Sequence, residues 1–213
     1  MSPANGLYPT TECQLNETVR DWHQIPISTS LAAGVHDLVV AVTDRGRALA
    51  EVSLGQVTVK GRPRLMEPPP LSSPLAAVFG DRVALLGVVE PDEIQVAPGA
   101  TVTLTLAWQA LTTPTEDLVR FVHVLGPDGR PVSQSDGVPC NGDCVSASWL
   151  TGEVLIDEIR VQIPIDLPPG SYPLGVGWYD SATLERLPAR DANGQPLADN
   201  LVILPLTVDV GSN

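Results

Sequence analysis

Apolar side chains in this chain recur at every second position, and prolines and glycines interrupt them at short intervals. In Thr101–Trp108, the residues Val102, Leu104 and Leu106 share one phase with Trp108, while threonines take most of the other. A period of two is typical of a β-strand with one buried and one solvated face. The 21 prolines and 18 glycines also exclude long helices, because proline breaks a helix interior. The pattern therefore predicts an all-β chain.

Similar runs appear further along the chain. The strand candidates are residues 82–89, 118–125, 131–135, 159–165, 174–178 and 201–208. Turn signals lie between them, namely Pro98-Gly99, Asp128-Gly129 and Pro169-Gly170. An Asp-Gly pair between two strand runs is a specific hairpin signal. Many short strands at this spacing predict an antiparallel β-sandwich of the immunoglobulin-like or jelly-roll type.

The beginning of the chain resembles a later part at a fixed distance. Residues that recur at an offset of 136 are Pro3, Asn5, Gly6, Glu17, Asp21 and Gly34, which match Pro139, Asn141, Gly142, Glu153, Asp157 and Gly170. A Gln-Ile-Pro-Ile run at residues 24–27 recurs at residues 162–165. The apolar phase is kept, since Leu38, Val40 and Val42 fall on Leu174, Val176 and Trp178, and Val57–Val59 is matched with Leu206–Val208. Such self-similarity indicates a repeated structural module.

The repeat divides the chain into one complete module and the second half of another. Residues 1–62 are predicted to form a partial β-sandwich and residues 75–210 a complete one. Residues 63–74 form a Pro-rich linker, whose proline run favours a stiff polyproline segment. A half sandwich exposes an apolar face and unpaired strand edges. We therefore expect this chain to be part of a longer protein, or its incomplete N-terminal module to pair with another chain in an oligomer.

The charge of the chain argues against two classes of partner, nucleic acids and membrane surfaces. Twelve basic against 25 acidic residues give a net charge of −13, which argues against nucleic-acid binding, because phosphate contacts need clustered basic side chains. No apolar run has the length of a membrane span, and Lys60 is the only lysine. These features fit a solvated exterior better than a membrane-adherent surface.

Several motifs of the complete module carry a family resemblance. They are residues 79–87 (FGDRVALLG), 96–99 (VAPG), 104–110 (LTLAWQA), 121–130 (FVHVLGPDGR), 167–172 (LPPGSY), 177–180 (GWYD) and 185–188 (ERLP). With these motifs the chain resembles the C-terminal, extracytoplasmic β-sandwich modules of certain bacterial membrane glycosyltransferases. Those enzymes are similar to the mannosyltransferases that use lipid-linked sugars. The resemblance implies an accessory region without catalytic residues, because the catalytic acids of such transferases lie in a membrane region that these motifs do not include.

One cysteine pair stands out. Cys140 and Cys144 have a spacing that could close a small disulfide ring in an oxidising compartment. Free thiols are the alternative. A metal site would need further ligands, and the sequence offers neither a second cysteine pair nor a histidine cluster.

Other titratable residues point to structural roles. The histidines are dispersed, and His123 is expected within a strand as a hydrogen-bonded or surface residue. Aspartates such as Asp128 and Asp180 lie in predicted turns, where the side chain caps its own backbone; a calcium site among such loops is the alternative. We therefore expect no catalytic residue, no metal site and no cofactor.

The aromatic residues are the best pointer to a ligand, because sugars stack on exposed rings. Trp108 and Trp178 share the phase of the core, so they are predicted to be buried. Trp22, Trp149 and Tyr179 fall in less regular positions and are the candidate glycan contacts.

These observations lead to one principal hypothesis and two alternatives. The chain is predicted to be a non-catalytic, extracytoplasmic β-sandwich accessory region of a larger membrane or cell-envelope protein, with a glycosyltransferase as the favoured parent. The first alternative is a carbohydrate-binding or adhesion module. The second is an assembly subunit whose half module is completed by a strand from another chain.

Overall fold

The computed structural model describes residues 14, 17, 18, 20, 25, 27, 31–44 and 47–211. The chain forms two compact units, Met1–Gly61 and Arg62–Asn213, each of which is considered by itself. Its regular elements are strands, accompanied in the described part by short 3-10 turns, so the prediction of an all-β chain is confirmed. Among the described residues, no helix is long and apolar enough to cross a membrane.

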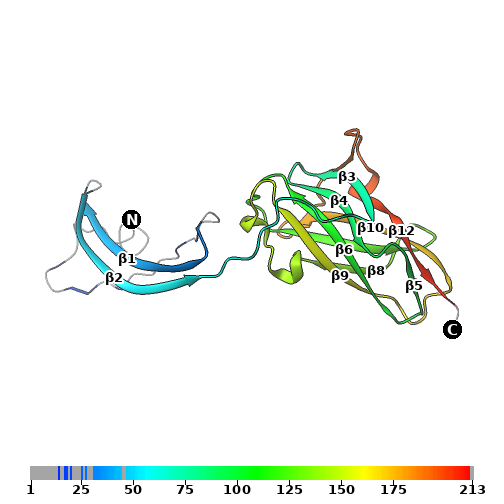
Figure 1. Ribbon diagram of the computed structural model, residues 1–213, viewed down its shortest axis with the longest axis horizontal. Coiled ribbons are helices and arrows are strands. Elements are labelled where there is room, and N and C mark those ends of the chain that lie inside the picture. Colours follow the sequence, from blue (N-terminus) through cyan, green and yellow to red (C-terminus); the bar gives the residue numbers. More distant parts are fainter. Residues whose placement is uncertain are drawn as a thin grey trace. The chain divides into compact units, whose positions relative to one another are not determined.

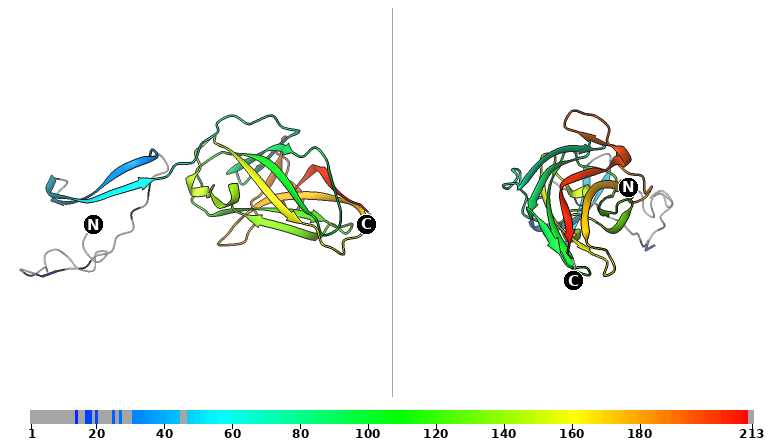
Figure 2. Two further views of the ribbon diagram at one scale, coloured as in Figure 1. Left: turned by 60° about the horizontal axis from the view of Figure 1, so that its bottom comes forward. Right: turned by 90° about the vertical axis from the view of Figure 1, so that its right-hand side faces the viewer.

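The second unit is a sandwich of two five-stranded sheets (Figure 1). One sheet has the order β11-β3-β4-β6-β9, formed by Ala189–Asp191, Ser73–Phe79, Val83–Glu90, Thr101–Ala110 and Val154–Gln162. The other has the order β5-β12-β10-β7-β8, formed by Ile94–Val96, Val202–Val210, Gly170–Asp180, Leu118–Leu125 and Pro131–Gly137. All neighbours are antiparallel except β5 and β12, which are parallel. Figure 2 shows the two sheets from two further directions.

The core lies between the two sheets and is built by the alternation seen in the sequence. Val102, Leu104 and Leu106 of β6 are buried, while Thr101 and Thr103 are exposed, as a half-buried strand requires. Thr105 departs from this pattern and is buried. It lies in the middle of a strand that pairs with both β4 and β9.

Tryptophans occupy the centre of this core. Trp178 makes edge-to-face contacts with Trp108, at 5.1 Å between ring centroids, and with Trp149, at 5.6 Å. All three are fully buried. The predicted burial of Trp108 and Trp178 is therefore confirmed.

The turn chemistry sets the strand ends. Gly129 has a φ of 76°, and it closes the β7–β8 hairpin with Asp128, as the Asp-Gly signal predicts. Asp128 accepts a hydrogen bond from the backbone N–H of Arg130, at 3.0 Å. The strand predicted over 159–165 instead ends at Gln162, because Pro164 cannot donate to the ladder; Ile165 beyond it is exposed.

In the first unit, the described strands form one antiparallel hairpin of β1 (Gly34–Asp44) and β2 (Arg47–Val59). The repeat matches β1 with β10 at the offset of 136, from Gly34/Gly170 to Asp44/Asp180. The pairing of β2 corrects one detail of the sequence match. Val59 lies opposite Gly34 as Val210 lies opposite Gly170, so Val57–Val59 corresponds to Val208–Val210, two residues later than predicted.

The segment predicted as a linker, residues 63–74, contributes at both ends to the second unit. Leu65 forms a β-bridge with Val154, and its backbone carbonyl accepts a hydrogen bond from the Val154 N–H at 2.8 Å. At the other end, β3 begins at Ser73. The stretch between these two contacts, residues 66–72, is therefore shorter than the predicted linker.

Candidate functional site

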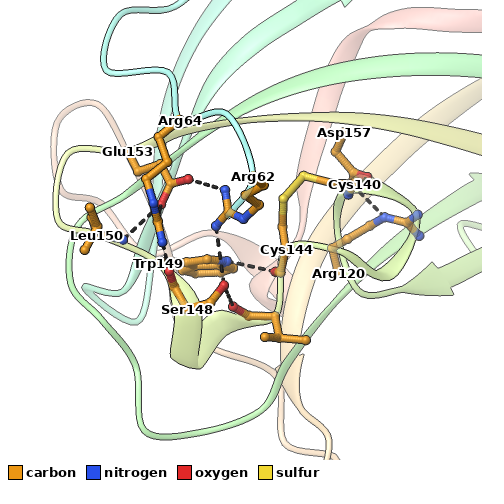
Figure 3. The surroundings of a disulfide bond; sticks show 11 residues. Arg62, Arg64, Arg120, Cys140, Cys144, Ser148, Trp149, Leu150, Glu153 and Asp157 are labelled. Carbon is orange, nitrogen blue, oxygen red and sulfur yellow. Dashed lines mark hydrogen bonds and ion pairs between the residues drawn. A yellow bond between two sulfur atoms is a disulfide. The ribbon is translucent and has the colours of Figure 1, made fainter. Parts of the chain in front are cut away.

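A disulfide joins Cys140 to Cys144 beside a dense polar cluster (Figure 3). The ring lies at the short turn η3 (Cys140–Gly142), which precedes a second turn, η4 (Ser146–Ser148). The indole Nε1 of Trp149 donates a hydrogen bond to the Cys144 carbonyl at 2.8 Å. The disulfide loop is therefore tied to the tryptophan core.

Trp149 was predicted as a glycan contact, and that prediction is wrong. Its side chain is fully buried and packs against Trp178. The residue lies in an irregular segment whose exposure cannot be read from a period-two pattern. The other tryptophan candidate, Trp22, lies outside the described residues.

Glu153 is a fully buried carboxylate that binds the first residues of the second unit to the sandwich. It forms ion pairs with Arg62 and Arg64 and accepts a hydrogen bond from the Leu150 N–H at 3.0 Å (Figure 3). Arg64 also donates to the Ser148 carbonyl, at 3.0 Å. Since its charge is compensated and its oxygens are engaged, this carboxylate acts as a structural anchor.

A second buried ion pair joins the two sheets. Arg120 Nε on β7 donates to Asp157 Oδ2 on β9 at 2.8 Å, and the Cys140 N–H donates to Asp157 Oδ1 at 2.9 Å. Burial raises the pKa of Asp157, while Arg120 and the Cys140 N–H oppose that shift. This ion pair therefore connects the disulfide loop and the two sheets to one another.

Loss of the disulfide is expected to lower the free energy of unfolding of the second unit by about 2 kcal/mol, because so small a loop removes little entropy from the unfolded chain. Urea unfolding of the Cys140→Ala/Cys144→Ala double variant measures this change. Cys13→Ala is the control, since it leaves the disulfide in place. Equal stability of the double variant and the parent would contradict the assignment of a stabilising role.

The predicted turn residue Asp180 caps its own backbone, since its Oδ1 accepts a hydrogen bond from the Ala182 N–H at 2.7 Å. Asp191, which was not predicted, does the same: its Oδ1 accepts from the N–H groups of Asn193 and Gln195. Over the part of the chain that the structure describes, His, Cys, Asp and Glu side chains form no group of three or more that could hold a metal ion.

The candidate ligand site is an open hollow of about 240 Å³ on the outer face of the β7–β10 sheet. Its lining residues come from β7, β8, β10 and the loop after β10, and they are Phe121, His123, Asp136, Tyr179, Leu184 and Arg186. Alternation on β7 explains the placement, because Val122 and Val124 belong to the core and their neighbours in sequence face the other way. Tyr179 follows the core residue Trp178 in the same manner.

A glycine positions the floor of this hollow. Gly177 on β10 lies opposite Phe121 on β7, and a side chain at Gly177 would stand 2.3 Å from Cζ of Phe121. The phenyl ring therefore occupies the space that a Cβ at this position would fill. Larger residues at this position would displace the ring.

The aromatic rings of the hollow pack against one another; Phe121 and His123 are buried, while Tyr179 is partly exposed. The Phe121 ring lies 4.6 Å from that of His123 and 6.4 Å from that of Tyr179, nearly parallel to the latter at 27°. The guanidinium of Arg186 lies over Phe121, with 4.6 Å between Cζ and the ring centroid. Arg186 is held there by donating to the Asp199 carbonyl, at 2.8 Å.

Polar groups border the rings on the same hollow. The Tyr179 hydroxyl lies beside the Asp136 carboxylate; burial, followed by the charge of Asp136, raises the pKa of Tyr179. Burial, followed by the charge of Arg186, lowers the pKa of His123 below its usual 6.5. At neutral pH the hollow thus offers a neutral imidazole, a phenol, a carboxylate and a guanidinium.

Leu184 forms an unusual part of the rim. Its side chain is 72% exposed, and its φ of 61° lies in the left-handed region, which costs a non-glycine residue free energy. The strained loop conformation thus places an apolar side chain at the edge of the hollow, in contact with water.

The lowered pKa of His123 predicts a pH-dependent stability. The pKa of His123 is near 6.5 in the unfolded chain and lower in the folded one. The contribution of the neutral ring to the free energy of unfolding is therefore fully present above pH 6.5. It is lost as the pH falls through the pKa of the folded state, because protonation of the buried ring is unfavourable there. Urea unfolding at pH 7.5 and pH 5.0 should show a smaller loss of stability for His123→Asn than for the parent. Equal losses would contradict the assignment.

Of the predicted glycan contacts that the structure describes, Tyr179 lines this hollow and Trp149 does not. Sequence reasoning missed the neighbours of Tyr179 because they lie on a face that carries no continuous pattern. One signal was available in the sequence, since Gly175 and Gly177 alternate with core residues on β10. A strand face without side chains indicates that something else packs there, and here it is Phe121 and Leu201.

A larger hollow of about 580 Å³ lies near the start of β3 and β12. Its lining is aliphatic apart from Asp191 and Asp199 and includes no aromatic ring. It offers fewer groups that could orient a polar ligand than the hollow at Tyr179.

The chain has only limited similarity to known proteins. No protein-family model and no curated protein matches the chain. Among solved structures, it is similar to the C-terminal domain of wzt, with a TM-score of 0.41 and 13% identity over 67% of this chain and 91% of that one. It is also similar to a family 123 glycoside hydrolase from Clostridium perfringens, with a TM-score of 0.36 and 8% identity over 65% of this chain and 27% of that one. A chain of a type I cohesin–dockerin complex from Clostridium thermocellum has a TM-score of 0.27 and 9% identity, covering 65% and 100%. With TM-scores below 0.5, we base no conclusion about function on these similarities.

Proposed function

We propose that this chain is a non-catalytic, extracytoplasmic accessory region of a larger membrane or cell-envelope protein, and that its second unit binds a glycan. The observation that carries the proposal is the hollow at Tyr179, where aromatic rings and hydrogen-bonding groups border one open surface. A glycosyltransferase remains the favoured parent protein, on the basis of the sequence motifs.

The chemistry of the hollow suits a sugar. A pyranose has an apolar C–H face, which can stack on the Tyr179 ring or lie against Leu184. Its hydroxyl groups need donors and acceptors arranged around that face. Asp136 accepts, Arg186 donates, and the neutral His123 can do either, depending on its tautomer.

The other features support an accessory role outside the cytoplasm. A disulfide persists in an oxidising compartment, and Cys140–Cys144 is tied to the core through Trp149. The acidic surface and scarcity of lysine suit a solvated exterior. The groups around Tyr179 supply recognition rather than a matched nucleophile and base, which is why we propose binding and not catalysis.

The test is a microarray of bacterial cell-surface glycans probed with the full chain. We expect at least one glycan to bind, and Tyr179→Ala to reduce its affinity at least tenfold, because the stacking ring is lost. Ile165→Ala is the matched control, since Ile165 is an exposed apolar residue outside the lining of the hollow. Binding that survives Tyr179→Ala unchanged, or no binding by the parent, would count against the proposal.

A further inference from the structure

The β1–β2 hairpin of the first unit reproduces the β10–β12 pair of the complete sandwich. Gly34 lies opposite Val59 as Gly170 lies opposite Val210, and Val40 lies opposite Val52 as Val176 lies opposite Val202. Both strand pairs also have a register shift at the equivalent place, next to Leu38 and Leu174. The β1–β2 hairpin therefore reproduces the pairing of β10 with β12, although β11 (Ala189–Asp191) lies between these two strands in the chain.

A turn outside the hairpin repeats as well. The Gln14 N–H donates to Glu17 Oε2 at 2.9 Å, while the Glu17 N–H donates to the Gln14 carbonyl. Leu150 and Glu153 form the same reciprocal pair in the second unit, 136 residues later. The first unit thus shares this turn, as well as the strand pairing, with the second unit.

The core face of the hairpin is exposed in the first unit. Val40 and Val42 are 49% and 58% exposed, whereas their equivalents Val176 and Trp178 are fully buried. Val52, opposite Val40, is exposed as well. Side chains that the module normally buries therefore meet water.

The opposite face of the hairpin is of a different kind. It is mixed: Asp37, Thr43 and Gln56 lie on it together with the exposed Val35 and Val39. The Gln56 amide donates a hydrogen bond to Asp37 Oδ1 at 2.9 Å. The face that matches the core face of β10 is the one with a continuous apolar row on β1.

The second unit specifies what normally covers that face. There, β7 pairs with β10 in an antiparallel manner, β5 pairs with β12 in a parallel manner, and the opposite sheet packs on the core side. Of these elements, β3 to β7 and all of β8 except its last residue, Gly137, lie within residues 62–136. In the frame of the repeat, residue 137 corresponds to residue 1, so these strands precede the part that the first unit repeats.

We propose that the β1–β2 hairpin is the docking surface for a polypeptide segment equivalent to β3–β8 of the same module, supplied from outside these 213 residues. The segment adds an antiparallel strand along β1, a parallel strand along β2 and a sheet over Leu38, Val40, Val42 and Val52. This inference is independent of the glycan site, which lies wholly within the second unit.

A fusion that places residues 62–136 directly before residue 1 of the full chain tests the proposal. It restores the order of the module. We expect hydrogen exchange at the β1 and β2 amides to slow at least a hundredfold relative to the parent, because both strands become interior strands of a packed sheet. Unchanged exchange in the fusion would overturn the proposal.

Matched variants of the fusion locate the contact. Val40→Asp/Val42→Asp changes the core face and should abolish the added protection, while Val39→Asp/Ala41→Asp changes the outer face of the same strand and should retain it. Val42→Trp restores the side chain that stands at position 178 and should slow exchange further. Equal effects of the two aspartate pairs would contradict docking through the core face.

The parent chain provides the remaining test. Light scattering should give a monomer mass of 22.5 kDa for the full chain, since the segment that covers the hairpin is not a second copy of it. A dimer that Val40→Asp/Val42→Asp dissociates would overturn the proposal, because a second copy would then cover the face.

Discussion

Replacing Trp178 with alanine is expected to lower the free energy of unfolding of the second unit by about 4 kcal/mol, the range for a fully buried tryptophan. Trp178 contacts both Trp108 and Trp149, so its loss leaves a cavity bordered by two indole rings from different segments. For a unit of this size, the thermal midpoint should fall by roughly 10 °C. Calorimetry and urea unfolding both measure the change.

Trp178→Phe tests whether the stability that Trp178 contributes comes from packing or from a hydrogen bond. The Trp178 Nε1 atom is buried and has no hydrogen-bond partner among the described residues, so phenylalanine removes volume without breaking a hydrogen bond. We expect it to cost less than half as much as alanine. If both variants cost under 1 kcal/mol, the three tryptophans would not be the centre of the core.

Asp157→Ala is expected to cost about 3–5 kcal/mol, the range for removing one partner of a buried ion pair. The substitution leaves the buried guanidinium of Arg120 without its counter-charge and the Cys140 N–H without its acceptor. Urea unfolding of the variant measures the loss.

The exposed pair Arg160–Glu158 is the matched control for this prediction. Its oxygen and nitrogen are 3.0 Å apart, yet both side chains reach solvent, so Glu158→Ala should cost under about 1 kcal/mol. Similar losses in the two alanine variants would show that burial is not what makes Asp157 important.

The sequence predicts the fold well where one strand face is buried and the other is solvated. The run from Leu118 to Leu125 and the Asp128-Gly129 turn are found where the alternation and turn chemistry place them. Proline explains the main difference in a strand end, since Pro164 stops β9 earlier than the apolar phase implies. In these segments local chemistry and tertiary packing agree.

Irregular segments and outer faces were harder to predict. Trp149 lies between two turns, where no period indicates burial, and only its contact with Trp178 explains its position. The hollow at Tyr179 combines three strands and a loop that are distant in sequence. Its residues come together through the pairing of β10 with β7 and of β7 with β8, which the order of strands along the chain does not reveal.

The repeat was visible in the sequence, but its consequence depends on the structure. Matching residues indicate a common module, while the exposure of Val40 beside the burial of Val176 identifies which face lacks its partner. The correct alignment of β2 with β12 also needed the strand register, because Val57–Val59 resembles Leu206–Val208 in sequence but pairs as Val208–Val210 does.

The most direct test of glycan binding at Tyr179 is a nuclear magnetic resonance titration of the full chain with ring-labelled tyrosine. The chain has only three tyrosines, Tyr8, Tyr172 and Tyr179, so Tyr179→Phe assigns the relevant signal. Tyr172 is an internal control, because it is buried and its hydroxyl donates to the Pro168 carbonyl at 2.7 Å. With the glycan selected on the microarray, we predict a saturable shift of the Tyr179 ring signal and no shift of Tyr172. A glycan that binds while the Tyr179 signal stays in place would contradict the assignment of this site.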